Sequence, residues 1–159
     1  MMEELLEYRQ RMINRFAEAP GLIDRAMAKI PDLNQALEEG GWNAHQVITH
    51  MRDVNSQVYL PRLQRIMNES DPIFKNFDGD AWMVDHYDPH EPLDAILNEL
   101  KEQCRTTADW LHQLALPSWN RNGIHPTIGT HTLQWWVERT LAHINEHVAQ
   151  LEGSVLDKE

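Results

Sequence analysis

Apolar side chains recur every three or four residues along four stretches of the chain, a spacing that predicts four amphipathic helices. The stretches cover about residues 4–29, 43–69, 92–117 and 130–153. Asn43 is expected to cap the second helix. Pro20 is expected to break or kink the first helix, because proline removes one backbone hydrogen bond. Pro31 and Pro117 should end the first and third helices, and Gly153 should stop the fourth.

Two segments lack this periodicity and are predicted to be loops. The first covers residues 70–91 and is rich in Pro, Gly and Asp. It follows the second helix, which Pro61 is expected to kink. The second segment covers residues 118–129. Loops of about twenty residues are uncommon inside a compact domain and are often functional. No segment has the alternation typical of a strand, so the pattern predicts an all-α four-helix bundle, one domain over residues 1–159, with a long loop between helices 2 and 3.

The histidines, nine in all, carry the strongest chemical signal. His143 and His147 lie four residues apart, so they share one face of the fourth helix. A helical wheel places both at the edge of its apolar side, and places His50 on the inner side of the second helix. On the same wheel His45 faces water.

Three inward histidines from two helices favour a metal site. A buried imidazole without a partner carries a desolvation cost, whereas a metal satisfies one nitrogen of each ring. Three His ligands with an open fourth position are typical of catalytic sites. A single inward histidine is more often a core residue bonded to a backbone carbonyl, so only the set of three favours the metal. A further interpretation is that the protein has lost its metal and that the three histidines remain from the former site.

Several segments, taken together in chain order, are similar to one known family. They are Gly41 to Asn43 (GWN), His50 followed by Asp53, residues 71–82 (DPIFKNFDGDAW), residues 125–133 (HPTIGTHTL) and residues 143–151 (HINEHVAQL). They resemble the DinB-like superfamily and, within it, the YfiT-like metal-dependent hydrolases and thiol S-transferases. The resemblance runs over residues 20–153. It implies an up-down-down-up bundle, a divalent metal held by His50, His143 and His147, and a homodimer.

These observations lead to two hypotheses about function. The first is a metal-dependent enzyme with a three-His divalent site, acting on a small molecule as a hydrolase or as a low-molecular-weight thiol S-transferase, with Zn or Ni as the expected metal. The alternative is a non-catalytic, dimeric helical protein that binds a metal or a small ligand. Asp53, Glu146, Arg121 and His125 are candidates for a supporting role, the first two because a ligating His commonly donates its second N–H to a carboxylate.

Composition narrows the classes of partner. The net charge of −11 and the lack of a basic patch argue against nucleic acid, and no apolar run is long enough for a membrane span. The acidic, polar start and the single cysteine, Cys104, fit a cytoplasmic protein. Cys104 lies on an apolar stripe and is expected in the core. The sequence holds neither His-Glu-x-x-His nor Glu-x-x-His, so neither a zincin protease nor a di-iron bundle is supported.

Overall fold

The computed structural model describes residues 1–156, with side chains to residue 153. Its helices are α1 (Met2–Ala28), α2 (Ala44–Val54), α3 (Leu60–Asn68), α4 (Gly79–His86), α5 (Leu93–His112) and α6 (Leu133–Leu156). A π-helical turn, η1 (Asn55–Tyr59), joins α2 to α3, and a 3₁₀ turn, η2 (Leu116–Asn120), follows α5. Two short strands, β1 (Asn122–His125) and β2 (Gly129–Thr132), precede α6.

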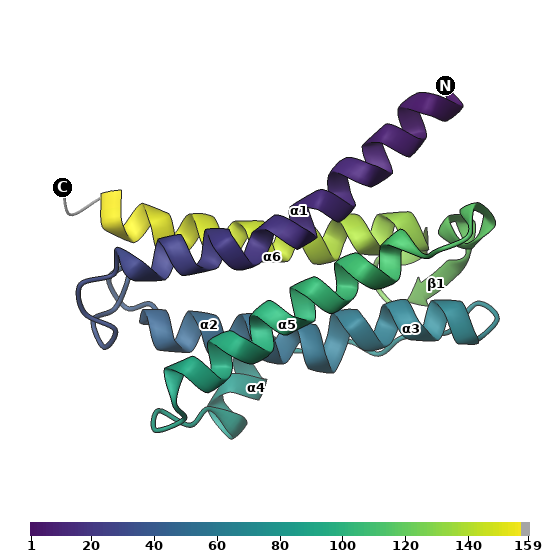
Figure 1. Ribbon diagram of the computed structural model, residues 1–159. Helices are drawn as coiled ribbons and strands as arrows, with labels where there is room; N and C mark the ends of the chain where they lie inside the picture. The colour runs from purple at the N-terminus through teal and green to yellow at the C-terminus, as the bar shows by residue number, and fades with distance from the viewer. Residues whose placement is uncertain (157–159) are drawn as a thin grey trace.

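The four long helical segments form the predicted up-down-down-up bundle. Figure 1 shows α1 and α6 running in one direction, and α2–α3 and α5 in the other. α1 packs against α5 and α6, and α2 packs against the same two helices. Two consecutive parallel segments, α3 and α5, require a crossover along the bundle, and residues 69–92 provide it.

Apolar burial holds the bundle together, and its core follows the predicted stripes. The largest fully buried side chains include Phe16, Ile23, Ile48, Met51, Ile96, Leu100, Leu133, Trp136 and Ile144. Each buried side chain of this size contributes about 1.5–3 kcal/mol. Asn43 caps α2 as predicted: it accepts from the Gln46 amide, and the Gln46 side chain accepts from the Asn43 amide.

The second predicted helix is interrupted at its centre. Pro61 has no amide hydrogen, so the α-helical ladder cannot continue unchanged through it. Immediately before it the ladder widens to the π pattern, in which the Leu60 amide donates to the Asn55 carbonyl. Such single π turns insert one extra residue and are frequent at functional sites.

The long segment 70–91 is not wholly irregular, as the sequence pattern suggested. It contains α4, whose N-cap Asp78 accepts from the Asp80 and Ala81 amides. The helix escapes periodicity analysis because its apolar residues Trp82 to Val84 are consecutive rather than spaced by a helical turn. It packs against α2.

The prediction of no strands was wrong for the second loop, which forms an antiparallel hairpin. β1 and β2 pair from Asn122 with Thr132 to His125 with Gly129. Gly129 takes a positive φ of 85°, a conformation that a side chain disfavours, at the start of β2. Backbone bonds from Phe74 to Ile124 and from Ile124 to Pro72 pin the hairpin to the crossover segment.

Pro20 does not break α1, which leaves a kink as the other expected outcome, and Gly153 does not end α6. α1 continues through Pro20, which is buried, because packing of the neighbouring core residues outweighs one lost hydrogen bond. The N-terminal part of α1 leaves the bundle at an angle (Figure 1). α6 continues past Gly153 to Leu156, so the glycine lies inside the helix rather than after it. No described helix combines the length and apolar character needed to cross a bilayer.

Candidate metal centre

Three histidines from two antiparallel helices meet inside the bundle. α2 supplies His50, and α6 supplies His143 and His147, one turn apart on the same face. The structure thus brings together the three residues that the sequence predicted as ligands. All three rings are half-buried, and one ring nitrogen of each lies within 4.8 Å of the others.

The Nε2 atoms converge too closely for hydrogen bonding alone to explain them. Nε2 of His143 lies 3.1 Å from Nε2 of His50 and 3.1 Å from Nε2 of His147. A ring nitrogen carries either one hydrogen or one lone pair, so Nε2 of His143 can satisfy only one of these neighbours. A shared cation satisfies all three lone pairs at once, and two ligands at about 2.1 Å from one ion lie roughly 3.0–3.4 Å apart. The donor set therefore fits a divalent metal.

The protonation state of the rings also suits a metal. Burial lowers the pKa of His50 to about 4 and that of His143 to about 3. The neighbouring imidazoles act in the same direction, while Asp80 and Asp53 act against it at His50. Both rings are therefore neutral at pH 7, the form that coordinates metals.

The surroundings fix each ring differently. His147 donates from Nδ1 to Oε1 of Gln150 at 2.8 Å, which leaves its Nε2 lone pair free for a metal. The Nδ1 atoms of His50 and His143 are buried without a hydrogen-bond partner among the described residues. These two rings are held by aromatic packing, Trp42 against His50 at 4.9 Å and Tyr59 against His143 at 5.4 Å between ring centroids.

A cavity of about 320 Å³ opens directly onto the cluster, with His50 and His143 in its wall. The same wall includes Tyr59 from η1, Arg62 from α3 and Arg139 from α6. No Asp or Glu belongs to this wall in the part of the chain that the structure describes. The open side of the histidine cluster therefore faces a small, cationic cavity.

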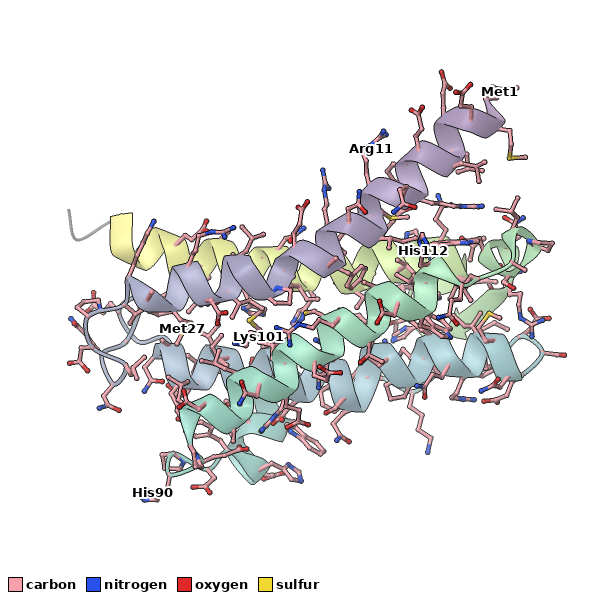
Figure 2. The ribbon with its side chains drawn as sticks, viewed as in Figure 1. Met1, Arg11, Met27, His90, Lys101 and His112 are labelled. Atoms are coloured by element: carbon pink, nitrogen blue, oxygen red, sulfur yellow. The ribbon has the colours of Figure 1, made fainter. Side chains whose placement is uncertain are left out.

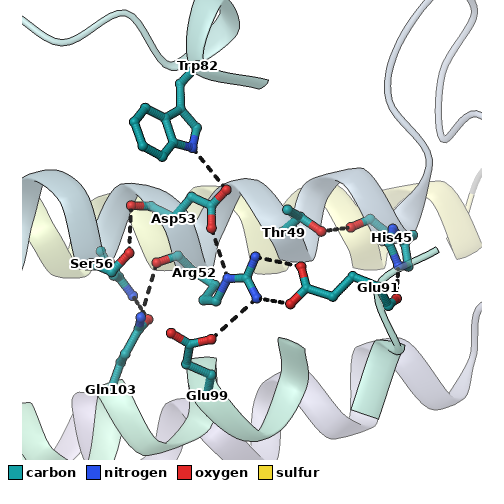
Figure 3. A network of polar contacts seen from close by, with 10 residues as sticks. His45, Thr49, Arg52, Asp53, Ser56, Trp82, Glu91, Glu99 and Gln103 are labelled. Atoms are coloured by element: carbon teal, nitrogen blue, oxygen red, sulfur yellow. Dashed lines mark hydrogen bonds and ion pairs between the residues drawn. The ribbon is translucent and has the colours of Figure 1, made fainter. Parts of the chain in front are cut away.

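A buried network of polar contacts joins the crossover segment to α2 (Figure 3). Arg52, 9% exposed, pairs with both carboxylate oxygens of Glu91 and also with Asp53 and Glu99. The Trp82 indole donates to the second Asp53 oxygen at 3.1 Å. These contacts hold α4 against α2, and so place Gly79 against the His50 ring.

The expectation that His45 faces water was wrong. It is 8% exposed, its Nδ1 lies 2.6 Å from the Tyr87 hydroxyl, and its Nε2 lies 2.8 Å from the Glu91 carbonyl oxygen. A helical wheel places it on the outer face of α2 correctly, but the crossover segment covers that face.

The four candidate supporting residues have different roles. Asp53 does not contact a histidine but binds Arg52 and Trp82. Arg121 donates to the Ile66 and Glu69 carbonyls, so it fastens the hairpin to α3. Glu146 is exposed. His125 lies in the wall of the cavity and is the one of the four that can meet a substrate.

The remaining thiol and loop histidines lie apart from the cluster. Cys104 is in the core as predicted, and burial raises the pKa of its thiol to about 12. His86 is exposed and stacks on Trp82, with ring centroids 3.6 Å apart. His90 lies at the far tip of the crossover, as Figure 2 shows.

Sequence reasoning missed Tyr59, Arg62, Arg139 and Gln150. Arg139 and His143 are four residues apart, so a wheel of α6 could have placed Arg139 on the same face as the candidate ligands. Tyr59 is the last residue of the π turn and Arg62 follows it, and a regular wheel does not reproduce this turn. Gln150 follows His147 by three residues and was within reach of the same spacing argument.

Comparison with known proteins agrees with this architecture. A model of the DinB superfamily matches residues 15–151, so the chain belongs to the DinB superfamily. A protein of Oceanobacillus iheyensis named "Putative metal-dependent hydrolase" is 26% identical over 141 residues, covering 83% of this chain and 81% of the relative. "Putative metal-dependent hydrolase YfiT" of Bacillus subtilis is 28% identical over 152 residues, covering 91% and 83%.

A solved structure supports the fold. It is described as YfiT from Bacillus subtilis, "a probable metal-dependent hydrolase with an unusual four-helix bundle topology". It superposes with a TM-score of 0.81 at 23% identity, covering 93% of this chain and 86% of that one. At this identity the likeness establishes the four-helix bundle topology and nothing about the reaction.

Proposed function

We propose that this chain is a metal-dependent enzyme in which His50, His143 and His147 hold one divalent ion and a small molecule reacts in the adjoining cavity. The observation that carries the proposal is the convergence of three histidines, two of which, His50 and His143, line that cavity. Three ligands leave at least one coordination position for water or substrate. Imidazole ligands suit Zn and Ni, so one of these is the expected metal.

The proposed site is compatible with two reaction classes, hydrolysis and transfer of a low-molecular-weight thiol. When bound, the metal would lower the pKa of water or of a thiol in its open position. Tyr59 and Asn76 line the cavity, and a phenol hydroxyl and a side-chain amide are both groups that can donate to a polarised substrate oxygen. His125 also lines the wall; its Nδ1 accepts from the Thr127 amide, so its neutral ring carries the hydrogen at Nε2 and can donate it to a substrate.

The composition of the wall favours thiol transfer over hydrolysis. Hydrolysis by a metal site commonly uses a carboxylate as general base, and the described wall contains none. A thiol that would ionise on the metal can release its proton to solvent, so it needs no such base. The curated relatives are named as hydrolases, so both activities belong in the first assay. The homodimer and the cytoplasmic location stay predictions from the sequence.

The test begins with metal content. Protein purified without a His tag should contain, or take up, one divalent ion per chain, and the His143→Ala variant should lose it. The loaded protein is then assayed with glutathione or bacillithiol and a chlorinated aromatic, and separately with small esters and amides. One bound ion with turnover in either assay supports an enzyme. A bound ion that is coordinatively saturated, without turnover, supports the non-catalytic binder. Failure to take up any divalent ion contradicts the enzyme and leaves the alternative of a protein that binds a small ligand without a metal.

A further inference from the structure

The charge of the cavity is opposite to that of the whole chain. The chain carries 25 acidic and 14 basic residues, a net charge of −11. The described wall of the cavity nevertheless contains Arg62 and Arg139 and no carboxylate. The contacts of these two arginines show how a positively charged site is maintained in an acidic protein.

Arg62 is held in place without a counter-ion. Its guanidinium lies 5.3 Å from the ring centroids of both Phe74 and Trp136, and it donates to the Lys75 carbonyl at 2.7 Å. Desolvation by burial lowers its pKa. No described carboxylate forms an ion pair with it. The side chain is therefore fixed in the wall with part of its donor fork unused.

Arg139 approaches the same region from the opposite helix. It lies one turn before His143 on α6 and is exposed, again with no ion pair to a described carboxylate. Both Arg139 and Arg62 act on the phenol of Tyr59, lowering its pKa against the larger opposite effect of burial. The Tyr59 ring contacts that of His143. Both arginines therefore lie near Tyr59, whose ring contacts the candidate ligand His143.

Four of the eight other arginines form ion pairs with described carboxylates, so such partners are common in this chain although not general. Arg52 pairs with Glu91, Arg65 with Glu69 and Arg105 with Glu102. The two arginines of the cavity lack such partners although acidic residues outnumber basic ones. Arginine is the side chain best matched to a planar carboxylate, through two parallel N–H donors.

We infer that Arg62 and Arg139 form an anion subsite that binds a carboxylate of the substrate or of its thiol co-substrate while the reacting atom lies at the three-His centre. This inference rests on the proposed function and names the class of molecule that the same site takes. It predicts that a carboxylate group, rather than size or apolar character, distinguishes good ligands from poor ones.

The experiment uses the full chain loaded with Co(II), whose visible absorption reports on its ligands. Thiols are titrated in matched pairs of two lengths: 3-mercaptopropionate with 3-mercapto-1-propanol, and 4-mercaptobenzoate with 4-mercaptobenzamide. In the rigid aromatic pair the carboxylate cannot reach the metal that holds the sulfur. In at least one pair we expect the carboxylate to bind about tenfold more tightly, the size of one charge-assisted hydrogen bond.

Three variants assign that preference to residues. Arg62→Gln and Arg139→Gln should each reduce it severalfold, while Arg65→Gln removes a charge from the same helix, α3, outside the cavity and should leave it unchanged. Arg139 is exposed, so its variant keeps the test valid if Arg62→Gln disturbs packing. Cobalt binding with equal affinity for both members of both pairs, or with no response to any of the four thiols, overturns the anion subsite alone. Failure to bind cobalt overturns the proposed function instead.

Discussion

The histidine cluster lies between two hollows of opposite character. The larger, about 600 Å³, is lined by Glu38 and Asp80 and reaches the cluster only through side chains that support it, Trp42 and Gln150. The smaller, about 320 Å³, is lined by two arginines and by the ligands His50 and His143 themselves. By volume alone the first hollow would be the expected substrate site. Only the second hollow, however, has candidate metal ligands in its wall. Under the proposed function, the comparison assigns the support of the candidate ligands to one flank and the binding of the substrate to the other.

The short helix α4 is the partition between the hollows. Its first residue, Gly79, belongs to the wall of the cationic cavity, and Asp80, Met83 and Val84 line the acidic one. The network around Arg52 and Asp53 fastens this partition to α2 (Figure 3). The distinction between the flanks therefore depends on one buried cation and its partners.

Removing that cation should have the largest effect. Arg52→Met leaves Glu91 and Asp53 without their partner, and we expect a loss of about 3 kcal/mol in the free energy of unfolding, at the low end for a buried pair because Glu91 is partly exposed. Urea denaturation measures it. Arg65→Met, which breaks the exposed pair with Glu69, should cost less than about 1 kcal/mol. Equal costs for the two variants would contradict the role of the network.

The same variant should change the acid dependence of stability. The hydrogen bond from Arg52 holds the pKa of Glu91 below its ordinary 4.5. Below pH 4.5 the unfolded chain therefore binds a proton that the folded one does not, so this stabilisation is lost as the pH falls through the lowered pKa. Arg52→Met should flatten that part of the profile, measured as unfolding free energy between pH 3 and 6.

On the supporting flank, Gln150→Leu should weaken metal binding by roughly 10- to 100-fold, because His147 loses the acceptor that orients its ring. Competition with a chelator of known affinity measures the change. Glu146→Gln, an exposed position one turn away on α6, is the matched control and should bind metal like the wild type. If both variants bind equally well, Gln150 does not orient the ligand.

Placing a large side chain at an exposed residue of each hollow distinguishes which of the two hollows binds the substrate. Ile128 at the cationic cavity and Val84 at the acidic hollow are 48% and 85% exposed, so tryptophan at either should be tolerated. Ile128→Trp should weaken binding of 4-mercaptobenzoate to the cobalt protein about tenfold, and Val84→Trp should change it less than about twofold. The reverse order would assign the substrate to the larger hollow.

The smallest effect is expected where the partition contacts a ligand. A Cβ on Gly79 would lie 3.0 Å from Cε1 of His50, so Gly79→Ala should displace that ring slightly and weaken metal binding about threefold. Gly153→Ala adds the same methyl group inside α6 with no atom within 4 Å and should leave metal affinity unchanged. Chelator competition compares the two, and equal affinities would show that Gly79 does not constrain His50.

The sequence predicted the parts of the fold that repeat over several turns. The four long helical segments, the Asn43 cap and the inward faces of His50, His143 and His147 follow from spacing alone. α4 has eight residues with consecutive apolar side chains, and each strand has four residues, so neither element holds enough repeats to define a period. His45 was misplaced because a wheel describes one helix and not the segment that covers it.

The cationic side of the site was hidden by the π turn. On a regular wheel Tyr59 and Arg62 lie about 180° and 120° from His50, away from the ligand face. One inserted residue turns everything after it back by about 100°, which brings Arg62 close to the direction of His50. Pro61 indicates an interruption but not its kind. A site assembled from a π turn, a hairpin and a crossover needs the three-dimensional structure.

The most direct test of this account is a crystal structure of the metal-loaded protein with diffraction data on both sides of the metal's absorption edge. The account predicts one anomalous peak among the Nε2 atoms of His50, His143 and His147, with the open coordination position directed into the cavity that contains Arg62 and Arg139. A peak elsewhere, an ion closed by a fourth protein ligand, or an open position facing the Glu38 and Asp80 side would contradict it.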